Sequence, residues 1–148
     1  MSARPETVAV RAGIATDPVH GAVSPPLHLS ANFAFAAFGE KRAYDYTRSG
    51  NPTRDELGSA LAALEGGAGA VVTATGMAAI TLVLALLRPG ELLVLPHDGY
   101  GGTWRLVNAL AQKGHFDVLV VDQRDPVAMA AVLARKPRLV WAESPSNP

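Results

Sequence analysis

The sequence of 148 residues has no cysteine, no excess of either charge and no long hydrophobic run. Without cysteine, the chain has no disulfide framework, no thiolate metal ligand and no cysteine nucleophile. Lys and Arg together number 13, as do Asp and Glu, so no basic excess exists to bind a nucleic-acid backbone or an anionic lipid surface. The longest apolar run, near Met77–Leu87, is interrupted by Thr81 and falls far short of the roughly 20 residues that span a bilayer.

Other scarce features narrow the function classes further. Lysine occurs only as Lys41, Lys113 and Lys136. We find no H-x-x-x-H metal pair and no G-x-S-x-G elbow, which gives a metal enzyme or a hydrolase little support. The N-terminal MSARPETVAVRAG lacks the apolar region of a secretory signal, so we expect a cytoplasmic protein. The content of 49% apolar and 18% charged residues is typical of a folded domain rather than a disordered segment.

The first 50 residues differ in character from the rest. They contain four prolines and little periodicity beyond a short helix expected near Glu6–Gly13. Such a segment cannot form a core alone, so we expect residues 1–50 to be an arm that lies on another domain or subunit. Residues 51–148 are expected to be the first part of an α/β domain.

Helical and apolar segments alternate regularly after residue 50. Thr53 and Glu56 match a capping box at the start of a helix that Gly66-Gly67 ends. Further helices are expected over Gly76–Leu87, Thr103–Lys113 and Pro126–Arg135. Buried strands are expected at Ala70–Ala74, Leu92–Leu95, Phe116–Val121 and Leu139–Ala142. Continuous apolar strands that alternate with helices indicate a parallel sheet covered on both faces.

Ligands of such sheets bind beyond the carboxyl ends of the strands, so the loops at that edge are the candidate site. Gly76 opens a helix whose free amides suit a phosphate or carboxylate, and the alternative is an ordinary turn. Tyr100, which lies between glycines, can lie flat against a planar ligand. His97 and Asp98 are a possible catalytic pair, but turn chemistry is the favoured interpretation.

Polar residues elsewhere in the chain also have both a binding and a purely structural interpretation. The segment Tyr44–Arg48 can recognise an anion, or it is a surface loop with an Asp–Arg pair. Asn147 can donate a hydrogen bond to a ring oxygen, or it is a turn residue. The glycine run Gly66–Gly69 precedes its strand and fails the dinucleotide spacing, so we interpret it as a helix stop.

Four motifs in one order are more specific than any of them alone. They are YTRSGNPT at 46–53, ATGMAAI at 74–80, DGYGGT at 98–103 and ESPSNP at 143–148. Together they resemble the pyridoxal-phosphate (PLP) enzymes of cysteine and methionine metabolism over essentially the whole chain. The resemblance implies an α/β, parallel-sheet fold of fold type I (aspartate aminotransferase-like), of which this chain is the N-terminal portion. It places the lysine that binds the cofactor covalently beyond residue 148, and none of the three lysines present matches that motif.

The resemblance also implies roles for residues at matching positions. The expected cofactor-binding residues are Tyr46, Arg48, Gly76, Met77, Tyr100 and Asn147. Tyr46 and Arg48 would reach the cofactor phosphate of a neighbouring subunit, and Tyr100 would stack on the pyridine ring and also act in catalysis. Asp45 and Arg105 are expected to contact substrate.

The activity that the resemblance implies is a γ-replacement in methionine biosynthesis. It joins an O-acylated homoserine, O-succinyl-L-homoserine in the first place, to L-cysteine and gives L-cystathionine. Ser49 stands where many such enzymes carry a second arginine, which leaves γ-elimination of cystathionine as the alternative. A catalytically incomplete fragment is a further alternative. A homotetramer built from dimers with shared active sites is expected, without metal, nucleic-acid or membrane partners.

Overall fold

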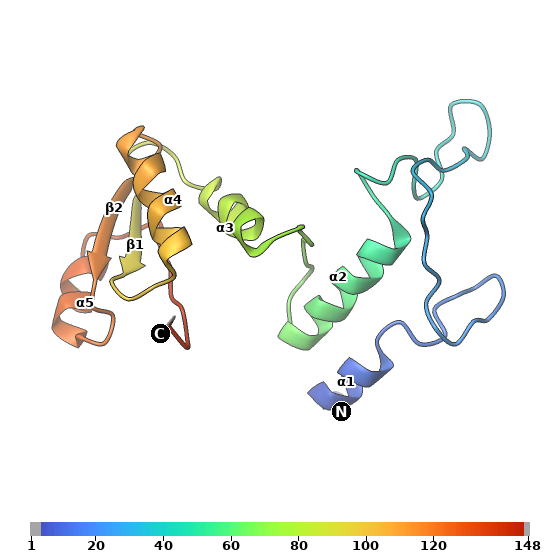
Figure 1. Ribbon diagram of the computed structural model, residues 1–148, viewed down its shortest axis with the longest axis horizontal. Coiled ribbons are helices and arrows are strands. Elements are labelled where there is room, and N and C mark those ends of the chain that lie inside the picture. The colour runs from blue at the N-terminus through green and yellow to red at the C-terminus, as the bar shows by residue number, and fades with distance from the viewer. Residues whose placement is uncertain (1–3, 147–148) are drawn as a thin grey trace. The chain divides into compact units, whose positions relative to one another are not determined.

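The computed structural model describes residues 4–146, and the chain divides into two compact units, Met1–Val72 and Thr73–Pro148. The helices and strands of the two units are labelled in Figure 1. No helix within residues 4–146 combines the length and apolarity that a membrane crossing requires. The expected role of residues 1–50 as an arm for a neighbouring subunit stays a prediction.

The first unit contains two helices, α1 (Pro5–Arg11) and α2 (Pro52–Glu65), joined by a long irregular segment. The expected capping box at Thr53 and Glu56 is wrong, because the residue that caps α2 is Asn51 and Pro52 is the first helical residue. Proline suits that position because its missing N–H has no partner there in any helix. Gly66 ends α2 in the left-handed conformation, at φ 64°, as the glycine pair predicted.

The expected strand at Ala70–Ala74 is also wrong. This segment is irregular, and Val71 is 74% exposed. A β-strand needs a neighbour to pair its backbone, and no strand among the described residues lies beside it. The apolar face of α2, formed by Leu57, Leu61 and Leu64, is likewise partly exposed.

The second unit is a three-stranded parallel sheet with helices. Its elements are α3 (Gly76–Leu84), β1 (Leu92–Pro96), α4 (Gly101–Gln112), β2 (Asp117–Val121), α5 (Pro126–Leu133) and β3 (Leu139–Val140). The strand order is β2-β1-β3, with Val94 of β1 opposite Leu119 of β2 and Val140 of β3. The parallel sheet is confirmed, although α3, α5 and β3 end two or three residues earlier than their sequence patterns predicted.

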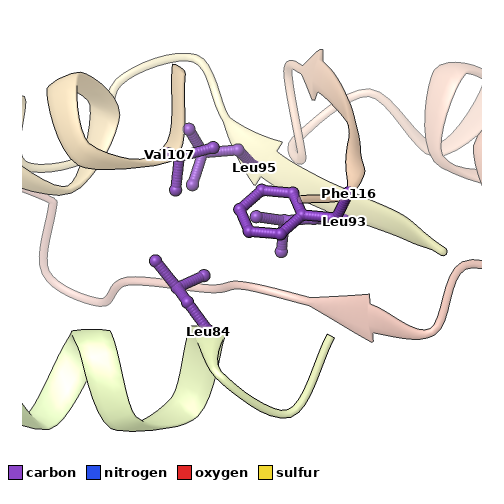
Figure 2. Packing of buried hydrophobic residues seen from close by; sticks show 5 residues of the cluster. All are labelled: Leu84, Leu93, Leu95, Val107 and Phe116. Atoms are coloured by element: carbon purple, nitrogen blue, oxygen red, sulfur yellow. The ribbon is translucent and has the colours of Figure 1, made fainter. Parts of the chain in front are cut away.

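The core of the second unit lies on one face of β1 (Figure 2). Leu93 and Leu95 of β1 face Leu84 of α3 and Val107 of α4, and Phe116 closes the cluster. Val94 points to the opposite face and is 0% exposed, as is Leu93. A central strand that is buried on both faces explains why its sequence is a continuous apolar run rather than an alternating one.

Candidate active site

The loop after β1 carries the predicted site tyrosine to the start of α4. His97–Tyr100 follow the last residue of β1 directly, and α4 begins at Gly101. The His97 N–H donates to the Val121 carbonyl at 3.1 Å, which keeps the loop beside the end of β2. The side chain of Tyr100 remains 45% exposed, so its ring has a free face for a ligand.

Gly102 brings the Tyr100 ring and Met77 together. A methyl group on its Cα would overlap the Tyr100 ring, lying 3.0 Å from Cζ, and would lie 3.1 Å from the Met77 Sδ. Gly102 is itself buried beneath these two side chains. The first turns of α3 and α4 therefore meet here, with the aromatic ring between them.

The N-terminus of α3 offers two amides to a ligand. The Thr75 hydroxyl caps the helix by accepting from the Ala78 N–H at 3.1 Å. Among the described residues, the N–H groups of Gly76 and Met77 have no hydrogen-bond acceptor. A Cβ on Gly76 would meet nothing within 4 Å, and its φ does not require glycine. The space beside Gly76 thus fits a phosphate group, which a helix N-terminus binds through its amides and positive dipole.

Glu143, which follows β3, holds the start of α4. Its Oε2 accepts from the Tyr100 backbone N–H at 2.7 Å, and its Oε1 accepts from the Trp141 indole N–H at 3.0 Å. The Tyr100 side chain does not cap α4, and the Glu143 carboxylate instead fixes the backbone of Tyr100 just before the helix begins. A Cβ on Gly99 would lie 3.1 Å from Pro96 Cγ and 3.5 Å from Glu143 Oε2, so the close fit depends on glycine there.

Replacing Glu143 with glutamine is expected to loosen the Tyr100 loop. The NH₂ end of the glutamine amide would face either the Tyr100 N–H or the Trp141 N–H and cannot accept a hydrogen bond from it. One hydrogen bond is therefore lost and the other weakens because its acceptor is no longer charged, which destabilises the folded loop by about 1–2 kcal/mol. We expect faster hydrogen exchange at the Tyr100 amide, measured by mass spectrometry on peptides that cover the loop. The matched control is Asp98→Asn, a charge change in the same loop at a carboxylate without a hydrogen bond among the described residues. Equal exchange rates in Glu143→Gln and the unmodified protein would contradict this role.

The charged groups after β1 and β2 are mainly engaged with one another. Arg124 forms two hydrogen bonds with Asp122, at 2.9 and 3.0 Å, and this contact lowers the pKa of Asp122 to about 2. His97 Nδ1 lies 3.9 Å from Asp98 Oδ1 and 3.8 Å from Asp122 Oδ1, beyond hydrogen-bond distance. The geometry therefore favours a turn over a His97–Asp98 catalytic pair.

Arg105 lies one helical turn along α4 from the site loop. Its Nη1 is 3.5 Å from the position of a Cβ on Gly101, so the guanidinium folds back toward the start of the helix. Asn147 lies outside the described residues. In the second unit, the structure thus brings Met77 of α3 and Tyr100 together over Gly102, and folds Arg105 back toward the start of α4.

The first unit carries the other predicted site residues. The Arg48 guanidinium carbon lies 5.1 Å from the centroid of the Tyr46 ring, a cation–π contact. Within residues 4–146, no carboxylate lies close enough to form an ion pair with Arg48. Its charge therefore remains available for an anion.

Asp45 is used within its own loop. Its carboxylate pairs with the Lys41 ammonium, which lowers the pKa of Asp45, and accepts from the Tyr46 N–H at 2.8 Å and the Ser49 hydroxyl at 3.2 Å. Ser49 also donates to the Tyr46 carbonyl at 2.8 Å. The expected substrate contact of Asp45 stays a prediction, and the contacts here describe a carboxylate that shapes the turn.

Sequence reasoning missed two residues that build this site. Gly102 and Glu143 stood inside motifs, but neither was assigned a role. Gly102 is the second of two adjacent glycines at the start of a helix. Because glycine has a low helix propensity, its presence there was the signal in the sequence. For Glu143, the sequence offered no signal, because its partner Tyr100 lies 43 residues away.

Within the described residues, no group of His, Asp or Glu side chains is arranged to hold a metal ion. The free amides at the start of α3, the exposed Tyr100 ring and Arg105 of the second unit instead suit a planar aromatic ring that carries a phosphate.

Comparison with known proteins agrees with this chemistry. Residues 6–148 match the model of the Cys/Met metabolism PLP-dependent enzyme family, and the chain belongs to that family. Its cofactor is PLP.

Particular relatives are cystathionine synthases and lyases. The chain is 56% identical over 149 residues to the cystathionine gamma-synthase of Escherichia coli (strain K12), covering 100% of this chain and 39% of the relative. The crystal structure of cystathionine gamma synthase from Xanthomonas oryzae pv. oryzae in complex with aminoacrylate and cysteine matches with a TM-score of 0.96 and 60% identity, over 100% of this chain and 38% of that one. Cystathionine gamma-lyase from Lactobacillus plantarum, complexed with L-serine, matches with a TM-score of 0.89 and 34% identity, over 99% of this chain and 38% of that one.

These matches confirm the predicted fold class. The second unit is the beginning of the parallel-sheet fold of PLP-dependent enzymes, and the chain spans somewhat more than a third of the length of the relatives it matches.

Proposed function

We propose that this chain forms the N-terminal part of a cystathionine γ-synthase. In this reaction the bond from Cγ of O-succinyl-L-homoserine to its ester oxygen breaks and succinate leaves. The cysteine sulfur forms the new bond to Cγ and loses its proton, which gives L-cystathionine. The observation that carries the proposal is the placement of the Tyr100 ring and Met77 over Gly102, beside the free amides of α3.

The residues of the second unit bind and orient the cofactor. PLP, when bound, supplies the electron withdrawal that loosens the bonds of the substrate. The amides of Gly76 and Met77 bind its phosphate, and Tyr100 stacks on its ring. Asn147 contacts the 3′ oxygen of the ring. The phenol of Tyr100, whose backbone N–H is held by Glu143, also exchanges a proton with the substrate.

The first unit serves a neighbouring subunit. Tyr46 and Arg48 contact the phosphate of that subunit's cofactor, in a homotetramer built from dimers with shared active sites. The free charge of Arg48 supports this role, as do the exposed apolar side chains of Leu27, Leu29 and Phe38, which are suited to a subunit contact.

Two observations bear on the choice between synthase and lyase. Ser49, at the position of a second arginine, is uncharged and its hydroxyl is directed at Asp45 and the Tyr46 carbonyl, so it cannot pair with a succinyl carboxylate. Arg105, at the start of α4, is then the residue that binds this carboxylate. The second candidate, γ-elimination of cystathionine, is favoured by Ser49 alone.

The proposal is tested with the holoenzyme and two acyl donors. We expect cystathionine to form from cysteine with O-succinylhomoserine faster than 2-oxobutanoate is released from cystathionine. Arg105→Ala should reduce kcat/KM for O-succinylhomoserine by about tenfold or more, the effect of a charge-assisted hydrogen bond, and leave O-acetylhomoserine unchanged because that donor lacks the distal carboxylate.

The matched control is Arg138→Ala, an arginine of the same unit that pairs with Glu91 at the amino end of the sheet. An equal loss for both donors in Arg105→Ala would contradict the carboxylate contact. Faster release of 2-oxobutanoate than formation of cystathionine would favour the lyase.

A further inference from the structure

Asn51 uses both the oxygen and the nitrogen of its side-chain amide in hydrogen bonds. It is 8% exposed, and its Oδ1 accepts from the Thr53 N–H at 2.9 Å as the N-cap of α2. Its Nδ2 donates to the Thr47 Oγ1 at 2.8 Å and to the His28 carbonyl at 3.1 Å. Capping requires only the oxygen, and serine or aspartate would provide one. The two amide hydrogens therefore do something that capping does not explain.

One of these hydrogens holds the loop that carries Tyr46 and Arg48. Thr47 lies between these two residues, so a bond from its side chain to Asn51 ties the backbone of both to the start of α2. Arg54, in the first turn of α2, adds a second tie, because its Nη2 donates to the Arg48 carbonyl at 3.3 Å. The helix thus holds the loop on both sides of the Arg48 Cα.

Other hydrogen bonds attach the same loop to a different part of the chain. The Thr47 N–H donates to the Ala31 carbonyl at 2.8 Å and the Phe33 N–H to the Asp45 carbonyl at 2.9 Å, so residues 45–47 also pair with residues 31–33. That pairing fixes the loop to another irregular segment. The bonds from Asn51 and Arg54 are the ones that fix it to a helix.

We propose that Asn51 is a positioning residue for Tyr46 and Arg48, and that its bond to Thr47 sets where these side chains meet the phosphate of the cofactor. The inference rests on the proposed function, in which Tyr46 and Arg48 bind that phosphate. Asn51 itself does not touch the cofactor. Its effect is on how well the loop is preorganised for an anion.

The chain offers two isosteric variants that separate positioning from stability. Thr47→Val removes the hydroxyl that accepts one hydrogen of the Asn51 amide, and it leaves the other hydrogen bonds of Asn51 in place. Thr53→Val is the control, because the Thr53 hydroxyl accepts from the His28 N–H at 2.9 Å and donates to the Pro26 carbonyl at 3.4 Å, without contacting the loop. Both remove one hydroxyl from the same end of α2.

The measurement is the affinity of the apoenzyme for PLP and for pyridoxal, which lacks the phosphate. We expect Thr47→Val to weaken PLP binding by about three- to tenfold, because PLP must then order a loop that one internal hydrogen bond no longer holds, and to change pyridoxal binding by less than about twofold. Thr53→Val should lower the thermal midpoint and leave the ratio of the two affinities unchanged. Asn51→Ser, which keeps a capping oxygen, should change the ratio as Thr47→Val does.

The affinities of Arg48→Ala for PLP and pyridoxal are measured as well. This variant separates failure of the positioning role from failure of the phosphate contact. If it changes the PLP-to-pyridoxal ratio and Thr47→Val does not, the positioning role of Asn51 is overturned while the phosphate contact stands. If Arg48→Ala itself leaves the ratio unchanged, the proposed phosphate contact fails and the inference fails with it. If Thr47→Val and Thr53→Val change the ratio equally, the network is only structural. Thr47→Val carries the test even if Asn51→Ser does not fold.

Discussion

Arg48→Ala is expected to weaken PLP binding by about 1.5–3 kcal/mol, because a charge-assisted hydrogen bond to the phosphate is lost. The structure leaves the Arg48 charge without a carboxylate partner among the described residues and holds it over the Tyr46 ring, so the guanidinium is ready to bind an anion. The dissociation constant of PLP, from titration of the apoenzyme, measures the effect. Arg42→Ala, an exposed arginine of the same segment, is the control and should bind PLP normally.

The same variant tests whether the contact crosses between subunits. Mixed dimers of Arg48→Ala with a variant that lacks the cofactor-binding lysine should regain one working site, because both defects then fall in the same site and the other site has an intact lysine and an intact Arg48. Activity in the mixture above that of both parents is the expected result. If no mixture exceeds its parents, Arg48 serves the cofactor of its own subunit or none.

Tyr100→Ala is expected to lose about 0.5–1.5 kcal/mol of PLP binding beyond the loss of contact area, the contribution of aromatic stacking. Its ring is half-exposed and lies on Gly102 beside Met77, where a pyridine ring can stack on it. Tyr100→Phe keeps the ring and should bind PLP nearly as well as the unmodified enzyme. If the phenol takes part in proton transfer, Tyr100→Phe should lower kcat with little change in PLP affinity.

Measuring both quantities in both variants separates stacking from proton transfer. An alanine variant with unchanged PLP affinity and kcat would show that Tyr100 is only a turn residue. Glu143→Gln is a useful comparison here, because it leaves the ring and the hydroxyl in place and changes the hydrogen bonds of Glu143 to the Tyr100 backbone and the Trp141 indole.

Local signals predicted much of the fold. The glycine pair after α2 marked the end of that helix correctly, and α5 begins at Pro126 as expected, because the caps at both places satisfy backbone groups within a few residues. The Asp125 side chain indeed accepts from the Val127 and Ala128 N–H groups. The capping box failed for the same reason that these succeeded: Asn51 and Pro52 offered a stronger local solution two residues earlier.

Signals that depend on a distant partner failed. Ala70–Ala74 has the composition of a buried strand, but a strand forms only where a neighbour takes its hydrogen bonds, and the described part of the chain places none there. Leu92–Leu95 has a similar composition and does form a strand, because β2 and β3 lie on either side of it.

By itself, the sequence determined the parallel α/β class, the family and the residue types at the site, because apolar runs and ordered motifs are properties of neighbouring residues. Only the tertiary structure decided how those residues act together. Glu143 meets Tyr100 across 43 residues, and Asn51 meets His28 across 23. Gly102 seats the Tyr100 ring against Met77 of another helix. Such contacts depend on strand order and helix packing, which bring distant residues together.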